Sequence, residues 1–374
     1  MLRSLGLAVG LAATTGARSE EPAAASPVDV FPPLPVWDAT FNVRGGGGYK
    51  DNVLLSAAAP DASSFLLAGL DLFVFRLPVG GTEFSAMVTG DFRRYLETPE
   101  AEKEQSVFVG FDVKQALGAG WKAGGAAQYF YFDQVFDAST TEDPELGIVK
   151  AVGHNVTVRP NVTRQFGAGT SIVLEGLAGW QFYEQPLDSH QDFGGRLTLR
   201  HETPWRAAFE TWYEFDRRPY ETRNETTATG VAIPGSRLTY QYHRLEGGWR
   251  QKWDAAGRWR TALRAGAEFN RDSGAGYYDY TRLLGSAQVR YVRDRWEVQA
   301  SLRLNRYDYD VQTTNFDNPE LRHKSTLVAG ARAQWEFVKR LRAFAEFERE
   351  QSEGNDPADR YSANTVFAGF EYEF

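Results

Sequence analysis

Charged side chains at every second position are the residues of this sequence best suited to act on a solute. They stand on the polar side of segments in which apolar and polar residues alternate. An arc of arginines near carboxylates would set a field across a water-filled passage and would favour polar or anionic solutes. The same residues could instead pair with one another and simply fill the space, and the sequence leaves both interpretations open. The candidate pore-lining residues are Arg196, Arg264, Arg303, Arg332, Glu210, Glu214, Glu346 and Glu348.

The sequence offers few candidates for a catalytic or metal-binding site. Asp188-Ser189-His190 contains the residue types of a hydrolase triad, but neighbours in one loop do not easily converge as a triad requires. Cysteine is absent, so a disulfide framework and a cysteine-based zinc site are excluded. The remaining histidines show no paired ligand spacing, so we expect no metal, no cofactor and no enzyme activity. These histidines are His154, His201, His243 and His323.

The elements that position the charged residues are predicted to be strands. From Trp37 onward, short turns and longer polar loops separate strand-like segments in strict alternation. This pattern predicts an all-β, transmembrane, antiparallel up-and-down β-barrel of about sixteen strands, with short periplasmic turns and longer extracellular loops. The short turns are expected near 78–81, 118–120, 167–169, 203–204, 254–257, 293–294 and 338–340. The loops are expected near 51–62, 97–104, 137–147, 184–188, 219–236, 272–276, 311–321 and 352–360.

Tryptophan placement favours a membrane barrel over a soluble sandwich built from the same strands. Eight of the ten tryptophans fall at the short-turn ends of the expected strands, as an interfacial aromatic girdle requires, whereas Trp180 and Trp212 do not. Two segments depart from the pattern. Residues 65–77 are apolar on both faces, and the alternation slips between Tyr242 and Leu245, which predicts a bulge. The eight tryptophans are Trp37, Trp121, Trp205, Trp249, Trp253, Trp259, Trp296 and Trp335.

Composition is compatible with a barrel of 374 residues. Aromatic residues make up 14% of the chain, and no apolar run reaches the length of a membrane-spanning helix. The mean hydropathy of −0.45 reflects the polar lumenal residues that dilute lipid-facing ones. A net charge of −8 argues against nucleic-acid binding. Residues 1–18 are predicted to be a signal peptide, 19–36 a Pro/Ala-rich periplasmic lead-in, and 37–374 the barrel.

Two segments resemble known barrel sequences. The last strand is apolar at alternate positions and ends on an aromatic residue, and it resembles the closing strand of bacterial outer-membrane β-barrels. The resemblance implies that Phe370, Tyr372 and Phe374 form the signal read by the barrel-assembly machinery. The segment Gly48-Tyr49-Lys50-Asp51-Asn52-Val53 resembles the opening strand of porin-like barrels that are often linked to exopolysaccharide export. The resemblance supplies no further functional residues.

Two classes of function follow from this fold. The first is an outer-membrane channel that passes small polar or anionic solutes, or that serves as the exit for a secreted polysaccharide. The second is a closed structural or surface-interaction barrel, such as an adhesin or envelope scaffold, and an outer-membrane hydrolase comes third. In each case the partners would be outer-membrane lipid and lipopolysaccharide. For a channel, loop 219–236 is expected to fold inward at the pore mouth and to form the selectivity zone together with the arc of arginines that includes Arg264 and Arg303.

Overall fold

The described residues of the chain fold into sixteen β-strands and two short 3₁₀ turns. A computed structural model describes residues 36–138, 147–184, 186–314 and 319–374, so the expected signal peptide and nearly all of the lead-in lie outside the described residues. Within these ranges no helix is long and apolar enough to cross a membrane. The first eight strands are β1 (Trp37–Lys50), β2 (Ser63–Val79), β3 (Thr82–Tyr95), β4 (Lys103–Gly118), β5 (Trp121–Asp137), β6 (Ile148–Phe166), β7 (Thr170–Tyr183) and β8 (His190–Glu202). The others are β9 (Ala207–Pro219), β10 (Thr239–Lys252), β11 (Trp259–Asp272), β12 (Tyr280–Arg293), β13 (Trp296–Thr314), β14 (Glu320–Val338), β15 (Leu341–Gly354) and β16 (Tyr361–Glu373), with η1 (Pro99–Ala101) after β3 and η2 (Pro357–Asp359) after β15.

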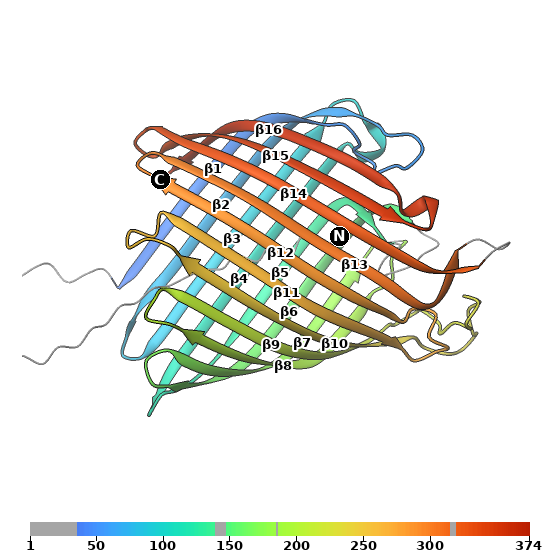
Figure 1. The fold of residues 1–374 in the computed structure, drawn as a ribbon, viewed down its shortest axis with the longest axis horizontal. Helices are drawn as coiled ribbons and strands as arrows, with labels where there is room; N and C mark the ends of the chain where they lie inside the picture. The colour runs from blue at the N-terminus through green and yellow to red at the C-terminus, as the bar shows by residue number, and fades with distance from the viewer. Residues whose placement is uncertain (1–35, 139–146, 185, 315–318) are drawn as a thin grey trace, which may run out of the picture.

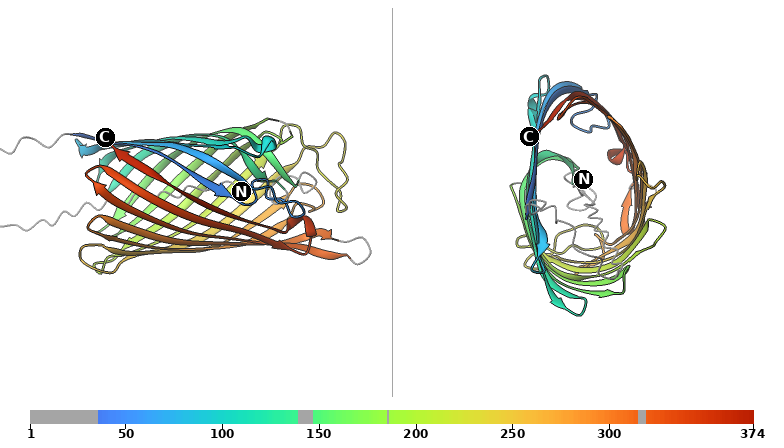
Figure 2. Two further views of the ribbon diagram at one scale, coloured as in Figure 1. Left: turned by 90° about the horizontal axis from the view of Figure 1, so that it is seen from above. Right: turned by 90° about the vertical axis from the view of Figure 1, so that its left-hand side faces the viewer.

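The sheet closes on itself. Each strand pairs antiparallel with its neighbours in the chain, and β1 pairs with β16 (Figure 1). Closure leaves no sheet edge with unpaired backbone groups, which is the condition for crossing a lipid bilayer with strands. The barrel is elongated in cross-section when viewed along its axis (Figure 2, right). The predicted fold class and the predicted number of strands are confirmed.

Turns and loops are sorted to opposite ends, as the sequence predicted. Gly80 and Gly81 join β2 to β3, and Ala119 and Gly120 join β4 to β5, while residues 220–238 form a long connection between β9 and β10. In barrels of this kind the short turns face the periplasm and the long loops face outward. The described strands therefore run between a periplasmic rim of turns and an extracellular rim of loops.

The two faces of the wall differ as alternation requires. Leu245, Leu263 and Leu302 are exposed on the outer face, where a bilayer would cover them. Side chains of the other parity face the lumen, because they form contacts between strands that are not neighbours in the sheet. Arg159 of β6, for example, reaches Glu214 of β9. Apolar residues facing lipid and charged residues facing the lumen make this a membrane barrel.

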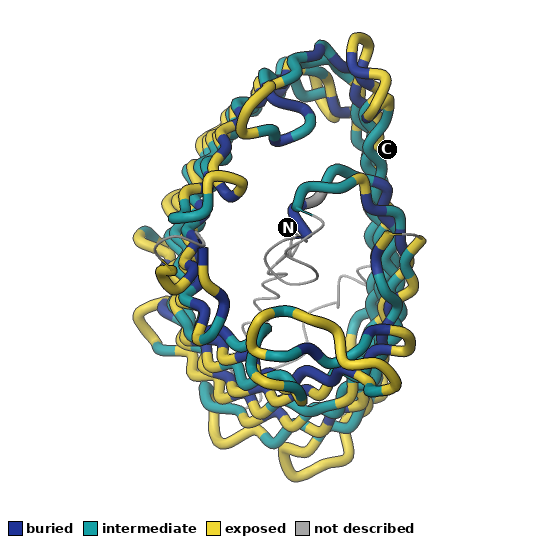
Figure 3. Tube along the Cα trace, turned by 90° about the vertical axis from the view of Figure 1, so that its right-hand side faces the viewer, coloured by how far each residue is buried: buried dark blue, intermediate teal, exposed yellow. Residues whose placement is uncertain are grey.

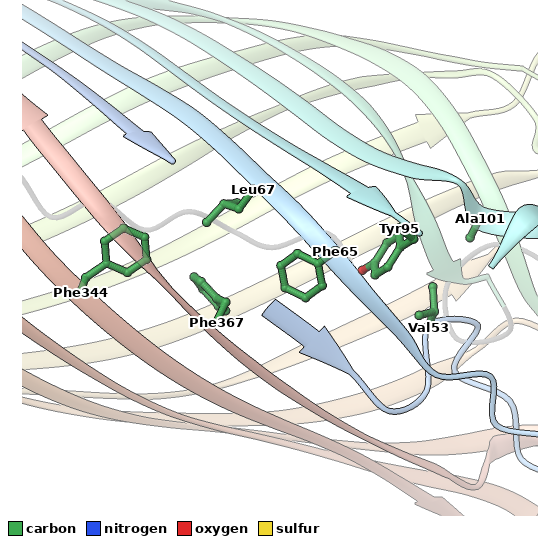
Figure 4. Close-up of a cluster of buried hydrophobic side chains, with 7 residues drawn as sticks. All are labelled: Val53, Phe65, Leu67, Tyr95, Ala101, Phe344 and Phe367. Carbon is green, nitrogen blue, oxygen red and sulfur yellow. The ribbon is translucent and has the colours of Figure 1, made fainter. Parts of the chain in front are cut away.

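The two irregular segments have separate explanations. In β2, Phe65 and Leu67 point inward and join a buried apolar cluster with Phe344 and Phe367 from β15 and β16 (Figure 4). The predicted bulge in β10 is wrong, because β10 keeps an unbroken register with both β9 and β11. The apparent slip arose because Tyr242 is an inward-facing aromatic residue that packs among other tyrosines.

The segment after β1 ties the first strand to the last. The carboxylate of Asp51 accepts hydrogen bonds from the backbone N–H of Asn364 (2.6 Å) and from its side-chain amide (2.7 Å). The side-chain amide of Asn52 donates to the carbonyl oxygen of Ser362 (3.0 Å), and Val53 is buried in the lumenal apolar cluster. This part of the opening motif therefore secures the β1–β16 seam at the loop end of the barrel.

Candidate functional site

A row of mostly charged side chains crosses seven neighbouring strands on the lumenal face. Its charges alternate in sign over the first five strands, and a tyrosine then separates the last two cations. Its members are direct partners in the strand register, so each side chain stands beside the next along the hydrogen-bonding direction. We call this set the register row. From β8 to β14 it consists of Arg196, Glu214, Arg244, Glu268, Arg282, Tyr307 and Lys324.

Two glutamates join the arginines of the row. Glu214 binds Arg196 (2.5 Å) and Arg244 (2.7 Å), and it also receives Arg159 (3.1 Å) from β6. The carboxylate of Glu268 binds the Nε of Arg244 (2.6 Å) and accepts a hydrogen bond from the hydroxyl of Tyr280 (2.9 Å). Each carboxylate is thus held by charge-assisted hydrogen bonds from more than one side.

Burial decides which charge of the row meets the lumen. The side chains of Glu214 and Glu268 are only 2% exposed, whereas those of Arg196, Arg244 and Arg282 are 25% exposed. Trp212 lies under Arg196, whose guanidinium stacks 4.2 Å from the centre of the indole ring. The arginines therefore cover the carboxylates, and a solute in the lumen meets guanidinium groups.

The loop end of β5, in the β5–β6 hairpin, lies inside the lumen and contacts strands on the other side of the barrel. Asp137, at the end of β5, pairs with Lys324 of β14, which lies far from β5 in the barrel order. Val135 packs against the apolar clusters around Phe65 and around Tyr361. In the end-on views this segment lies inside the ring of strands (Figure 2, right; Figure 3). The described stem of the hairpin therefore narrows the extracellular half of the lumen.

A buried group of four charges fixes the hairpin to the far wall, and we call it the clamp. Asp359 of η2 binds Arg322 (2.5 Å) and Lys324 (3.2 Å), and Lys324 also holds Asp137. Burial alone would raise the pKa of Asp359, but hydrogen bonds from Arg322 and the charge of Lys324 hold that pKa below its usual range. The carboxylate of Asp359 consequently stays ionised at neutral and mildly acidic pH.

The long connection between β9 and β10 lies against the inner wall at the loop end. Tyr220 and Leu238, at its two ends, are buried with the inward-facing Tyr240 and Tyr280. Arg223 stacks on Tyr278 at 4.4 Å. The loop expected to form the constriction is thus anchored beside the strands it joins. The segment that reaches the opposite wall is the β5–β6 hairpin.

The predicted pore-lining residues fall into four groups along the wall. Arg196 and Glu214 belong to the register row, while Glu210 pairs with Arg200 (2.7 Å) at a more exposed position. Arg264 lies 3.7 Å from Glu246 and is 47% exposed. The other four lie in β13 to β15, where Arg332 contacts Glu346 and Glu371 (both 3.3 Å). Arg303 and Glu348 complete this set, Arg303 opposite Ser286 and Glu348 opposite Gly330 in the register.

Sequence reasoning missed several of the central residues. Arg244 was hidden by the apparent slip between Tyr242 and Leu245, although the correct parity places it inward between Glu214 and Glu268. The clamp could not be found from parity, because its members come from β5, β14 and η2 and meet only across the lumen. Over the ranges described, no group of three or more His, Asp or Glu side chains is arranged to hold a metal ion.

Solved structures resemble this barrel as a whole. OccAB1 of Acinetobacter baumannii superposes with a TM-score of 0.50 at 8% identity, covering 90% of this chain and 97% of the other. A BenF-like porin from Pseudomonas fluorescens Pf-5 gives 0.49 at 9% identity, covering 90% and 99%. At this level of identity the likeness shows the fold alone, which is a closed β-barrel of the outer-membrane type. No family model matches the sequence, and no curated protein matches it.

The closed barrel and the two faces of its wall both bear on where the protein is located. A closed barrel with an apolar outer belt and charges inside is stable in a bilayer, and barrels of this kind occupy the bacterial outer membrane. Trp205 and Trp253 are about 60% exposed at the turn end, where a bilayer surface would meet them. The predicted location in the outer membrane is confirmed.

Proposed function

We propose that the protein is an outer-membrane channel for small polar solutes, with a preference for anions. The observation that carries the proposal is the burial of Glu214 and Glu268 beneath arginines that remain partly exposed to the lumen. In a confined pore, fixed guanidinium groups lower the energy of an anion and raise that of a cation. Arg264, nearly half exposed, extends this arginine surface toward the turn end.

The hairpin favours small solutes over a secreted polysaccharide as the cargo. Its stem is fixed by the clamp and by the contacts of Val135, so it occupies part of the lumen in the loop half of the barrel. The partly exposed arginines of the register row, Arg196, Arg244 and Arg282, lie on strands that the hairpin stem does not contact in these interactions. A hydrated small anion fits a lumen narrowed in this way better than a polymer chain does.

Ion selectivity in planar bilayers tests the proposal. Arg264→Glu combined with Arg303→Glu should move the reversal potential in a salt gradient from the anion side toward the cation side. At an effective dielectric constant near 20, each reversal changes the energy of an ion by about 1 kcal/mol or more. Arg306→Glu is the matched control, because Arg306 is exposed on the outer face of the same strand as Arg303.

The possible results are distinct. An unmoved reversal potential in the double variant would mean that these arginines do not select ions. No conductance from the wild-type protein would favour the closed structural barrel instead. A shift of equal size in the Arg306→Glu control would show that the effect does not arise in the lumen.

A further inference from the structure

The periplasmic rim of the barrel is divided into two unlike halves. The turns β2–β3, β4–β5 and β6–β7 consist of glycine and uncharged residues. The turns β8–β9, β10–β11, β12–β13 and β14–β15 instead carry a run of exposed basic residues, which we call the basic half-rim. Its members are Arg206, Arg258, Arg293, Arg295, Lys339 and Arg340.

Nearby carboxylates leave most of this charge free. Asp254 is occupied by the backbone N–H groups of Arg258 and Trp259, both at 3.0 Å. Asp294 lies 3.6 Å from Arg293 and is itself largely exposed. Among the residues that the structure describes, the side chains of the other five members form no ion pair. The basic half-rim therefore presents a positive surface that the protein does not neutralise.

Two arginines of the basic half-rim have a strained backbone conformation. Arg206 (φ 68°) and Arg340 (φ 70°) lie in the left-handed region, which disfavours residues with a Cβ atom. In the uncharged turns, glycine takes most of the left-handed positions, as at Gly81 and Gly167. Glycine would be the less strained residue at Arg206 and Arg340 as well, so at both positions a strained backbone carries an exposed guanidinium group.

Each basic turn also carries exposed tryptophan close to its cation. Trp205 precedes Arg206, Trp259 follows Arg258 and Trp296 follows Arg295, and Trp335 lies near the end of β14. Exposed indoles locate the boundary between lipid tails and headgroups. Guanidinium groups one residue away lie at the depth of the phosphates, to which arginine donates bidentate hydrogen bonds.

We infer that the basic half-rim binds the headgroups of anionic phospholipids in the periplasmic leaflet of the outer membrane. The opposite half of the rim does not share this surface. There, Arg164 is engaged with the carbonyl oxygen of Ala119 and stacks on Trp121 at 5.0 Å. The protein consequently gathers anionic lipid along the β8–β15 side of its perimeter, whether or not the lumen conducts.

Lipid competition measured with the full-length protein tests this inference. Tryptophan fluorescence is recorded in vesicles containing brominated phosphatidylglycerol or brominated phosphatidylcholine, and the quenching gives their relative association constants. The wild type should prefer phosphatidylglycerol by about fivefold for each arginine-bound headgroup at low salt. The preference should weaken at high salt, because the charges are exposed.

Arg206→Gly with Arg340→Gly removes two charges and relieves the backbone, so this variant should fold at least as well as the wild type. Its preference for phosphatidylglycerol should fall several-fold. Arg164→Gln is the control in the uncharged half and should keep the wild-type ratio. Equal quenching by both lipids in the wild type would overturn the inference, as would an equal loss in the control. Binding of labelled polyglutamate by the detergent-solubilised protein without any lipid preference would point instead to a soluble acidic partner.

Discussion

At Glu214, three guanidinium groups converge on one buried carboxylate. Arg159, Arg196 and Arg244 all lie within 3.1 Å of its oxygens, and the side chain is 2% exposed. If the carboxylate is removed, three cations are left close together in a site from which most water is excluded. Loss of one partner from a buried ion pair costs about 3–5 kcal/mol.

Glu214→Gln should therefore lower the free energy of unfolding in detergent micelles by an amount of that order. Urea titration followed by the mobility shift of the folded barrel on unheated gels measures it. Glu210→Gln on the same strand is the control: its pair with Arg200 is substantially exposed, so it should cost about 1 kcal/mol or less. Equal losses in the two variants would contradict the role assigned to Glu214.

The clamp makes a corresponding prediction for the β5–β6 hairpin. Lys324→Met removes the cation that joins Asp137 to Asp359, and of the ion pairs that define the clamp only the pair of Asp359 with Arg322 is kept. The hairpin should then detach from β14, and single-channel conductance should rise and become noisier. Lys150→Met, a half-exposed lysine on the stem of the same hairpin, should leave conductance at the wild-type level. Unchanged conductance in Lys324→Met would mean that the apolar contacts of Val135 suffice to hold the hairpin.

The clamp also predicts how channel conductance should depend on pH. Because the folded-state pKa of Asp359 is depressed, its contribution to stability is fully present above the unfolded value near 4 and is lost as pH falls through the folded value. Wild-type conductance should consequently be constant from pH 7 to about pH 5 and should increase only in stronger acid. A transition near pH 6 would show that another group controls the hairpin.

The strands and turns of the barrel could be predicted from the sequence, whereas the position of the β5–β6 hairpin could not. Strand number and turn positions followed from local signals, namely period-two alternation and turn residues, and the structure agrees with them. The crossing of the hairpin did not follow, because Val135 and Asp137 have the parity and composition of an ordinary strand end. Only their partners on β14 and β16 place them across the lumen. Contacts between strands far apart in the barrel leave no periodic trace in a single strand.

For the whole molecule, the seam between β1 and β16 decides whether the sheet closes. The two strands pair from Asn42 opposite Glu373 to Lys50 opposite Thr365. The stacking of Phe374 on Phe41 (5.1 Å) and the hydrogen bond from its backbone N–H to Phe41 (2.9 Å) extend the contact at the turn end. We propose that the predicted assembly signal of Phe370, Tyr372 and Phe374 acts where this seam is completed.

Glycine at the centre of the seam allows the two backbones to approach. A methyl group on Gly46 would overlap the carbonyl oxygen of Ala368 on β16, whereas one on Gly45 would meet its nearest atom at 3.9 Å, in ordinary contact. Gly46→Ala should therefore push β1 away from β16 and lower both the yield of folded barrel in membrane fractions and its thermal stability on unheated gels. Gly45→Ala places the same methyl group on the outer face one residue away and should behave as the wild type. If both variants fold equally well, the seam has enough slack to absorb a side chain, and its closure must depend on the Asp51–Asn364 hydrogen bonds and the Phe374 contact at its two ends.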